Sequence, residues 1–287
     1  MSDWSDWIGR EQRSADRIDE ALAARWLATL DLSAPAGANM PQGIHFALCT
    51  PQAPTAMLGE DGHPARSDDP ASLYPPIDLP RRMWAGSKIA FLRPLAIGDR
   101  IDKSSRVASI DEKDGRSGRL AFLKLEHSIA ANGEPAIRET QTLVYREASP
   151  PDAPLVPPEV VKGAFDPRAW DRVRTLTPTE ALLFRFSALT FNTHRIHYDA
   201  PYAQRTERYR GPVVHGPLLA TLLLQELAEL AGPNGLSHFA FSARSPAIAG
   251  DVLHLAVRET DEGYECAALN DAGTALTHAN ARAKTTS

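Results

Sequence analysis

The sequence is poor in cysteine, with only Cys49 and Cys266 among 287 residues and no CxxC pair. This excludes a disulfide framework and a cysteine-ligated zinc site. The N-terminus has no basic start followed by an apolar core, so the sequence predicts no secretory signal and a cytoplasmic protein. The longest apolar stretch, residues 216–232, contains one glutamine and two glutamates. It is shorter than the ~20 residues that a membrane span needs, so we expect no membrane association.

An excess of positive charge is also missing. Lysine and arginine number 31 against 36 aspartates and glutamates, which gives a net charge of −5. A nucleic-acid-binding surface needs clustered positive charge, so no nucleic-acid partner is expected. Apolar residues make up 43% of the chain and charged residues 23%, as in an ordinary globular protein. The length suggests two domains of about 150 residues.

A proline-rich stretch, residues 147–159, divides the chain into two nearly equal halves. It holds five prolines and shows no hydrophobic periodicity, so it cannot continue a helix or a sheet. We therefore predict an N-terminal domain at 1–148, a linker at 149–160 and a C-terminal domain at 161–287.

The two halves share a pattern of an aromatic strand, a proline turn, a Gly-Asp turn and a new strand. The spacing of 152 positions and the flanking strands favour a duplication, although any two β domains can share Gly-Asp turns. The matching pairs are Pro94 with Pro246, Gly98 with Gly250, and Asp99 with Asp251.

Both halves then continue as alternating apolar and polar segments separated by hairpin-type turns, which predicts antiparallel meanders. Helices are expected at 18–30 and 177–189, the second opening with a capping box of Thr177 and Glu180 and with Pro178 as its first residue. Residues 216–231 predict a third helix that is apolar on most of its surface and must therefore be buried. The fold class expected is α+β, a double hotdog of two antiparallel sheets, each curled round a helix.

Residues 191–203, FNTHRIHYDAPYA, are the part of the chain richest in groups that carry protons or bind metals. His194 and His197 are three apart, and His215 or Asp199 could complete a metal set. No HExxH-type helix surrounds the pair, so we predict no metal. A purely structural polar loop stays open as an alternative.

Proton transfer explains more of this region. Gly216 begins the buried helix, so its N–H lacks a partner within the helix and lies at the positive end of the helix dipole. Such a donor stabilises an oxyanion, although a plain helix start is the simpler reading. A histidine base beside an oxyanion donor suits chemistry next to a thioester carbonyl.

Three segments of the second half carry a resemblance: 186–203, 211–223 and 239–255. Together they resemble the MaoC-like branch of the hotdog superfamily, the (R)-specific enoyl-CoA hydratases and related dehydratases. In the first half, LGEDGHP at 58–64 and the segment 79–99 resemble the divergent, non-catalytic N-terminal hotdog of two-domain members. Within that family the chain is most similar to the mesaconyl-C4-CoA hydratases, the itaconyl-CoA hydratases and the mitochondrial-type 3-hydroxyacyl-thioester dehydratases.

The resemblance implies an acyl-CoA substrate, no cofactor and a homodimer. The family motif Asp-x-Asn-Pro-x-His places its histidine on His197, but Asn192 stands where the catalytic aspartate is expected. An asparagine amide cannot exchange a proton at neutral pH. The usual two-group division of acid and base therefore does not carry over.

We expect Gly216 N–H to bind the thioester oxygen and His197 to activate water or, in reverse, to remove the proton; a pKa near ~6.5 suits this. Asn192 holds the water, while His194 either orients Asn192 or is the second proton carrier. A solvated face is the alternative reading of the basic residues around the site. The residues expected to bind substrate or CoA are Arg195, Tyr198, Arg208, Arg210, His215 and Arg82.

The sequence thus predicts a hydro-lyase that hydrates a branched C5-dicarboxylic thioester, mesaconyl-C4-CoA or itaconyl-CoA, to citramalyl-CoA. One alternative is a straight-chain 3-hydroxyacyl-thioester dehydratase of fatty-acid metabolism. Another, of a different class, is an inactive acyl-thioester binding protein. A thioesterase is disfavoured because the motif offers no carboxylate at the family position.

Overall fold

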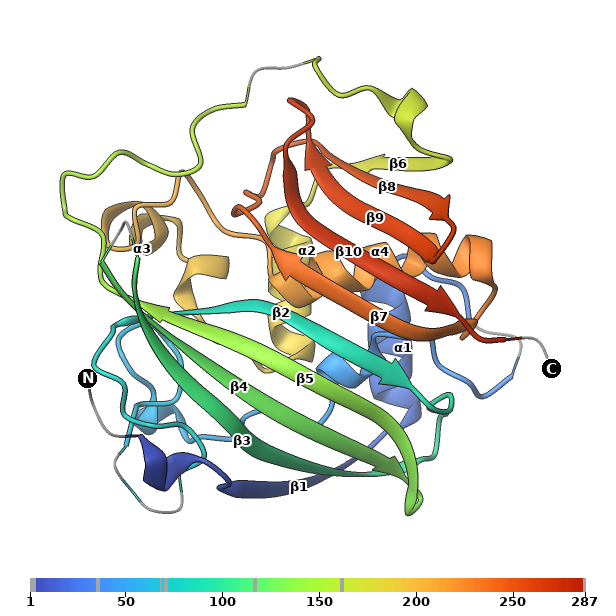
Figure 1. Ribbon diagram of the computed structural model, residues 1–287, viewed down its shortest axis with the longest axis horizontal. Helices are drawn as coiled ribbons and strands as arrows, with labels where there is room; N and C mark the ends of the chain where they lie inside the picture. The colour runs from blue at the N-terminus through green and yellow to red at the C-terminus, as the bar shows by residue number, and fades with distance from the viewer. Residues whose placement is uncertain are drawn as a thin grey trace.

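The structure is a computed structural model that describes residues 4–34, 37–67, 69, 72–115, 118–160 and 163–285. Its described strands form one ten-stranded antiparallel sheet in the order β1-β3-β4-β5-β2-β7-β10-β9-β8-β6 (Figure 1). The strands are β1 (Glu11–Arg17), β2 (Arg81–Phe91), β3 (Arg100–Gly115), β4 (Gly118–Ala131), β5 (Glu134–Arg146), β6 (Arg172–Leu176), β7 (Leu236–Ala243), β8 (Leu253–Thr260), β9 (Gly263–Asn270) and β10 (Ala275–Ala283).

The sheet order is symmetrical about the β2–β7 pair, so the second half repeats the first in reverse. The seam between the halves is an antiparallel ladder from Gly86 opposite Ser242 to Ala90 opposite His238. The turns after β2 and β7 match as well: Met40 N–H donates to Leu95 O at 2.7 Å, and Val214 N–H donates to Ala247 O at 2.8 Å. The duplicated strand pattern is confirmed.

Two features differ from the expected double hotdog. The two predicted sheets are one continuous sheet, because the edge strands β2 and β7 hydrogen-bond to each other. The helix predicted at 18–30 is present at Glu20–Thr29, but among the described residues after it and before β2 no α-helix corresponds to the one at 216–231. That stretch holds the short 3₁₀ turns η2 (Ile44–Ala47) and η3 (Thr55–Met57), where Pro51 and Pro54 prevent a helix from continuing.

Three of the four described α-helices lie together beside the sheet, and α3 (Ala200–Arg205) lies apart from them (Figure 1). α4 (Gly216–Ala231) packs on β7, β8, β9, β10 and β2, and is buried as predicted. α1 (Glu20–Thr29) contacts α2 (Glu180–Leu189) through the rings of Trp26 and Phe186. The described residues also include η1 (Ser5–Trp7), η4 (Pro167–Ala169) and η5 (Arg195–His197).

The start of α2 corrects the predicted capping box. The N-cap is Thr179, whose side chain accepts the Leu182 N–H, and Pro178 lies before the cap. Thr179 is the better cap because its oxygen is adjacent to the first helical turn, where the free N–H groups lie. The N-cap of α1, Asp19, does the same for Leu22 N–H.

The proline-rich stretch packs against the second half. Val156 forms a parallel bridge with Tyr209, and its N–H donates to Arg208 O at 2.9 Å. One hydrophobic core also includes residues of both halves, such as Ile89 and Phe239. The division into domains at 1–148 and 161–287 stays a prediction. No helix among the described residues is long and apolar enough to cross a membrane.

Candidate active site

The predicted motif lies directly after α2, where the chain leaves the helix. Asn192 N–H donates to Ser187 O, and Asn192 Oδ1 accepts the N–H of His194 at 3.0 Å. This turn leads into η5, which ends at His197. His194 and His197 are both buried, at 6% and 8% exposure. The local turn therefore directs both imidazoles into the molecule.

Four histidine rings lie in a row that joins the two halves. The His63 and His194 ring centroids are 4.1 Å apart, and those of His194 and His197 are 5.5 Å apart in an edge-on arrangement. His197 stacks on His215 with centroids 3.6 Å apart. We call these residues the histidine row. The sequence analysis singled out three of them, His194, His197 and His215. The fourth, His63, comes from the first half of the chain.

His197 has a defined tautomer. Its Nδ1 lies 2.7 Å from Val213 O, a carbonyl that can only accept, so Nδ1 carries the proton and Nε2 keeps a lone pair. Burial lowers the pKa of His197 to about 4, although the hydrogen bond to the Val213 carbonyl acts to raise it. The pKa is below the unperturbed value of about 6.5 because desolvation disfavours the imidazolium. At pH 7 His197 is a neutral base.

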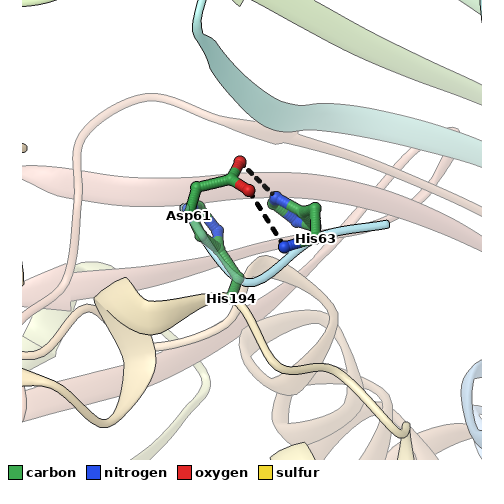
Figure 2. A group of neighbouring side chains, drawn as sticks. All are labelled: Asp61, His63 and His194. Carbon is green, nitrogen blue, oxygen red and sulfur yellow. Dashed lines mark hydrogen bonds and ion pairs between the residues drawn. The ribbon is translucent and has the colours of Figure 1, made fainter. Parts of the chain in front are cut away.

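His63 is paired with a carboxylate. Its Nδ1 lies 2.8 Å from Asp61 Oδ2, and its backbone N–H donates to Asp61 Oδ1 at 3.0 Å (Figure 2). Burial and the charge of Arg82 lower the pKa of His63 to about 4, although Asp61 opposes this. Burial raises the pKa of Asp61, but the hydrogen bonds and charge of His63 outweigh it and lower that pKa to about 2. The pair at pH 7 is a carboxylate and a neutral imidazole with Nδ1–H.

The loop that carries Asp61 is fastened to the motif of the second half. Arg195 N–H donates to Asp61 O at 2.9 Å, and Thr193 Oγ1 donates to Gly62 O at 2.5 Å. Gly62 has φ +85°, and a Cβ there would lie 1.9 Å from Thr193 O. Only glycine allows the two backbones to approach this closely. This contact places the first-half pair against His194.

Gly216, the predicted oxyanion donor, is the first residue of α4. Its N–H donates to no acceptor among the residues that the structure describes. The preceding residue, His215, stacks on His197, so the helix start and the base are adjacent. His215 Nε2 lies 2.8 Å from Ser187 Oγ, which holds the ring behind His197.

A cavity of about 260 Å³ lies beside Asp61 and His63. Three arginines line it, and two of them are engaged. Arg66 donates to carbonyls including Leu79 O and Pro80 O, and Arg81 pairs with Glu207. Arg82 lies over the ring of Tyr74, 5.2 Å from its centroid. Within the described chain, no carboxylate forms a salt bridge with Arg82.

The other predicted binding residues lie around the site with defined partners. Arg195 pairs with Asp199 at 2.7 Å and donates to Glu60 O, while Arg210 pairs with Asp251. The Arg208 guanidinium donates to the linker carbonyl of Ala153 at 2.7 Å. Two further predicted residues are Tyr198, half exposed and donating to Thr193 O, and His215, which is 1% exposed.

Asp61, His63 and His194 also offer ligand atoms within 4.8 Å of one another, which raises the question of a metal. The His63 and His194 rings lie face to face with their planes tilted by 38°. The lone pairs of an imidazole lie in its ring plane, so two such rings do not aim at one point about 2 Å from both. The arrangement favours hydrogen bonding over coordination.

Sequence reasoning missed Asp61 and His63. From the sequence alone, LGEDGHP shows only a family likeness, and the first half is expected to be non-catalytic. The detectable feature was an aspartate and a histidine two apart on either side of a glycine, in a loop. Nothing local could place that loop next to His194, 131 residues from His63.

Comparisons with known proteins show the family of the chain. The family model for hydroxyacyl-thioester dehydratase type 2 matches residues 43–249. The mesaconyl-C(4)-CoA hydratase of Chloroflexus aurantiacus is 43% identical over 251 residues, which cover 85% of each chain.

Solved structures agree on the fold. A MaoC-like dehydratase from Phytophthora capsici matches with a TM-score of 0.71 and 12% identity over all of both chains. A Mycobacterium tuberculosis protein with a double hotdog fold matches with a TM-score of 0.54 and 13% identity, covering 96% of this chain and 94% of that one.

Fold and family together define a hydro-lyase, a hydratase or dehydratase with an α+β hotdog fold. The chain belongs to the hydroxyacyl-thioester dehydratase type 2 family, within the MaoC-like hotdog enzymes. The resemblance seen in the sequence is confirmed.

Proposed function

We propose that this protein adds water reversibly to the double bond of a branched C5-dicarboxylic CoA thioester, mesaconyl-C4-CoA or itaconyl-CoA, to give citramalyl-CoA. The 43% identity to a mesaconyl-C(4)-CoA hydratase supports this substrate class. Mesaconyl-C4-CoA carries its free carboxylate and its methyl group on the β carbon, where the hydroxyl is added. A matching site needs one cation near the reacting carbons.

Arg82 is the observation that carries the proposal. Of the three arginines that line the cavity, it is the one without a carboxylate or carbonyl partner within the described residues. Its charge acts on Asp61, His63 and His194, so it lies next to the site. A guanidinium in this position can hold a carboxylate with two parallel hydrogen bonds.

The remaining roles follow from the site geometry. Gly216 N–H donates a hydrogen bond to the thioester oxygen and stabilises its developing charge, with the dipole of α4 behind it. His197 exchanges a proton with the substrate through Nε2. Asn192 holds the motif turn through Oδ1 and keeps its amide N–H groups for the water. Arg195, Tyr198, Arg208, Arg210 and His215 stay proposals for CoA contacts or for support of the site.

The test is turnover of a small thioester panel: mesaconyl-C4-CoA, itaconyl-CoA, crotonyl-CoA and a long straight-chain enoyl-CoA. Arg82→Gln should raise KM for the preferred dicarboxylic thioester about 10–100-fold, since a hydrogen bond to a charged group contributes about 1.5–3 kcal/mol. KM for crotonyl-CoA should stay within about twofold. Arg106→Gln, an exposed arginine on β3 that pairs with Glu126, is the matched control.

The outcomes separate the candidate functions. Equal effects of Arg82→Gln on both kinds of thioester would contradict carboxylate recognition. A wild-type preference for the long straight chain would favour the second candidate, a 3-hydroxyacyl-thioester dehydratase, which the family's name supports. Tight thioester binding without any turnover would indicate an inactive binding protein.

We also propose a cytoplasmic homodimer, by likeness to the family. Light scattering on the purified chain, with a monomer mass of 31.2 kDa, tests the assembly. Cell fractionation tests the compartment.

A further inference from the structure

We propose that the first half of the chain supplies the second proton carrier of this active site: His63, positioned by Asp61. The proposal rests on the proposed hydration of a thioester and adds a catalytic residue to it. It also changes the expected role of the first half from a non-catalytic domain to part of the catalytic machinery.

The need for a second carrier follows from the chemistry. Hydration of an α,β-unsaturated thioester such as mesaconyl-C4-CoA removes a proton from water at the β carbon and adds a proton at the α carbon, two atoms that one side chain does not serve equally well. Asn192, at the position of the family's acid–base aspartate, cannot exchange protons. Its Oδ1 is also occupied by the N–H of His194. The motif alone therefore leaves His197 without a partner.

The Asp61–His63 pair has the geometry of a base with an orienting carboxylate. The 2.8 Å contact holds the proton on Nδ1, so Nε2 keeps its lone pair. Nε2 makes no hydrogen bond within the described part of the chain. The two side chains are 24% and 18% exposed and border the cavity, so a substrate can reach them. Asp61 also stabilises the imidazolium that forms when His63 takes a proton.

A second pair shows the difference between this arrangement and a structural one. The Nε2 atom of His254, on β8, lies 2.7 Å from Asp271 Oδ1. The corresponding contact of His63 is made by Nδ1, 2.8 Å from Asp61 Oδ2. Its other nitrogen, Nδ1, lies 2.9 Å from Thr175 Oγ1, and its ring stacks on Phe165. Both nitrogens of His254 are therefore engaged. His63 keeps one free beside a cavity.

We assign each group to one part of the substrate. His215, which precedes Gly216, stacks on His197, so Gly216 N–H and His197 are assigned to the thioester oxygen and the α carbon. His63 lies two rings from His197, beyond His194 and beside the cavity, and is assigned to the β carbon. Arg82 acts on His63, at the carboxylate that the β carbon carries.

The step balances with one proton. His63 Nε2 takes a proton from water as the water oxygen bonds to the β carbon, and the double-bond electrons move to the thioester oxygen at Gly216 N–H. The His63 imidazolium releases this proton to solvent through the cavity that it borders, and His197 Nε2 takes up one proton from solvent. His197 delivers it to the α carbon as the enolate collapses. The histidines end the cycle as they began, and dehydration is the reverse.

The experiment compares His63→Gln and Asp61→Asn with the control Asp271→Asn, which removes the carboxylate from the structural pair. His63→Gln should lower kcat about 10²–10⁴-fold with KM changed less than about threefold, the range for loss of a general base. Asp61→Asn should lower kcat at least about 10-fold, and Asp61→Glu should restore part of it. Asp271→Asn should keep wild-type kcat.

The pH profile separates positioning from mere structure. Asp61, Arg82, Arg66 and His194 surround His63, and among them only Asp61 raises its pKa. In Asp61→Asn the acid limb of the kcat/KM profile should therefore move to lower pH. Circular dichroism and thermal melting check that the variants are folded.

Each outcome decides the proposal. If the wild type turns over a thioester and His63→Gln has the same kcat as Asp271→Asn, this inference is overturned. The proposed function would still stand. A wild type that turns over none of the thioesters would overturn both. Activity lost on chelation and restored by Zn²⁺ would also overturn it, because Asp61, His63 and His194 would then be metal ligands. Activity unchanged by chelation is expected.

Discussion

At the residue scale, burial decides what the histidines can do. His194, His197 and His215 are all nearly excluded from water, and desolvation lowers the pKa of each. A neutral imidazole accepts a proton, whereas an imidazolium would only repel Arg82 and its neighbours. The buried row therefore keeps its lone pairs at physiological pH.

His197→Gln should lower kcat by about 10²–10⁴, because glutamine can still donate to Val213 O but cannot carry a proton. The measurement is steady-state turnover of the preferred thioester. His238→Gln, an exposed histidine on β7, is the control and should keep full activity. Near-wild-type turnover of His197→Gln, with an intact fold, would rule out His197 as the base.

At the scale of single elements, the N-terminus of α4 and the loop around Gly62 are the two parts that position the chemistry. Both are places where the backbone rather than a side chain makes the decisive contact. Substitutions that change only the backbone can test them.

Gly216→Pro removes the proposed oxyanion donor and keeps the helix start, since proline suits the first helical position. His215 has φ −61° and ψ 135°, a conformation that allows a following proline. We expect kcat to fall about 10²–10³-fold. Gly216→Ala keeps the N–H, and its Cβ would lie 3.8 Å from Trp84 O, an ordinary contact. Equal activities of the two variants would contradict the oxyanion role.

Gly62→Ala should separate the Asp61–His63 loop from the second half and lower kcat more than about 10-fold, as a misplaced catalytic group does. Gly133→Ala is the matched control: its φ is +86°, close to the +85° of Gly62, but a Cβ there would meet nothing within 4 Å. Both variants should lose about 1–2 kcal/mol of stability from the positive φ. Turnover measured beside thermal melting separates the effect on catalysis from the effect on stability. An active Gly62→Ala would contradict the proposed role of the close contact between Gly62 and Thr193.

At the scale of the whole molecule, one sheet and one core join the halves, so we expect them to unfold together. The first half contributes buried titratable groups of its own. Burial and the charge of Lys103 lower the pKa of His45 to about 3, and burial likewise lowers that of His127 to about 3. The site adds His63 and His197, each lowered to about 4.

Stability should therefore decrease between pH 6.5 and about 4. In that window the unfolded chain binds protons that the folded chain refuses, so each such histidine lowers the free energy of unfolding by about 1.4 kcal/mol per pH unit. Glu139 opposes this, because burial raises its pKa and it gains a proton in the folded state. Urea unfolding at pH 7, 6 and 5 measures the slope, and His45→Leu should reduce it. A slope of zero would contradict the burial of neutral histidines.

The sequence by itself determined the local elements and the second-half motif. The apolar helix at 216–231, the turns around Gly98 and Gly250, and the position of His197 next to the start of α4 all follow from neighbours in the chain. These features depend on caps, periodicity and turn residues, which act over a few positions.

Only the tertiary structure decided which distant segments of the chain come into contact. The β2–β7 ladder merged two expected sheets into one, 3₁₀ turns took the place of a second buried helix in the first half, and Gly62 placed Asp61 and His63 against His194. Hydrogen bonds between distant edges and a close backbone approach leave no periodicity in either segment. The partner of a proton carrier more than a hundred residues away is therefore set by packing, which no local pattern encodes.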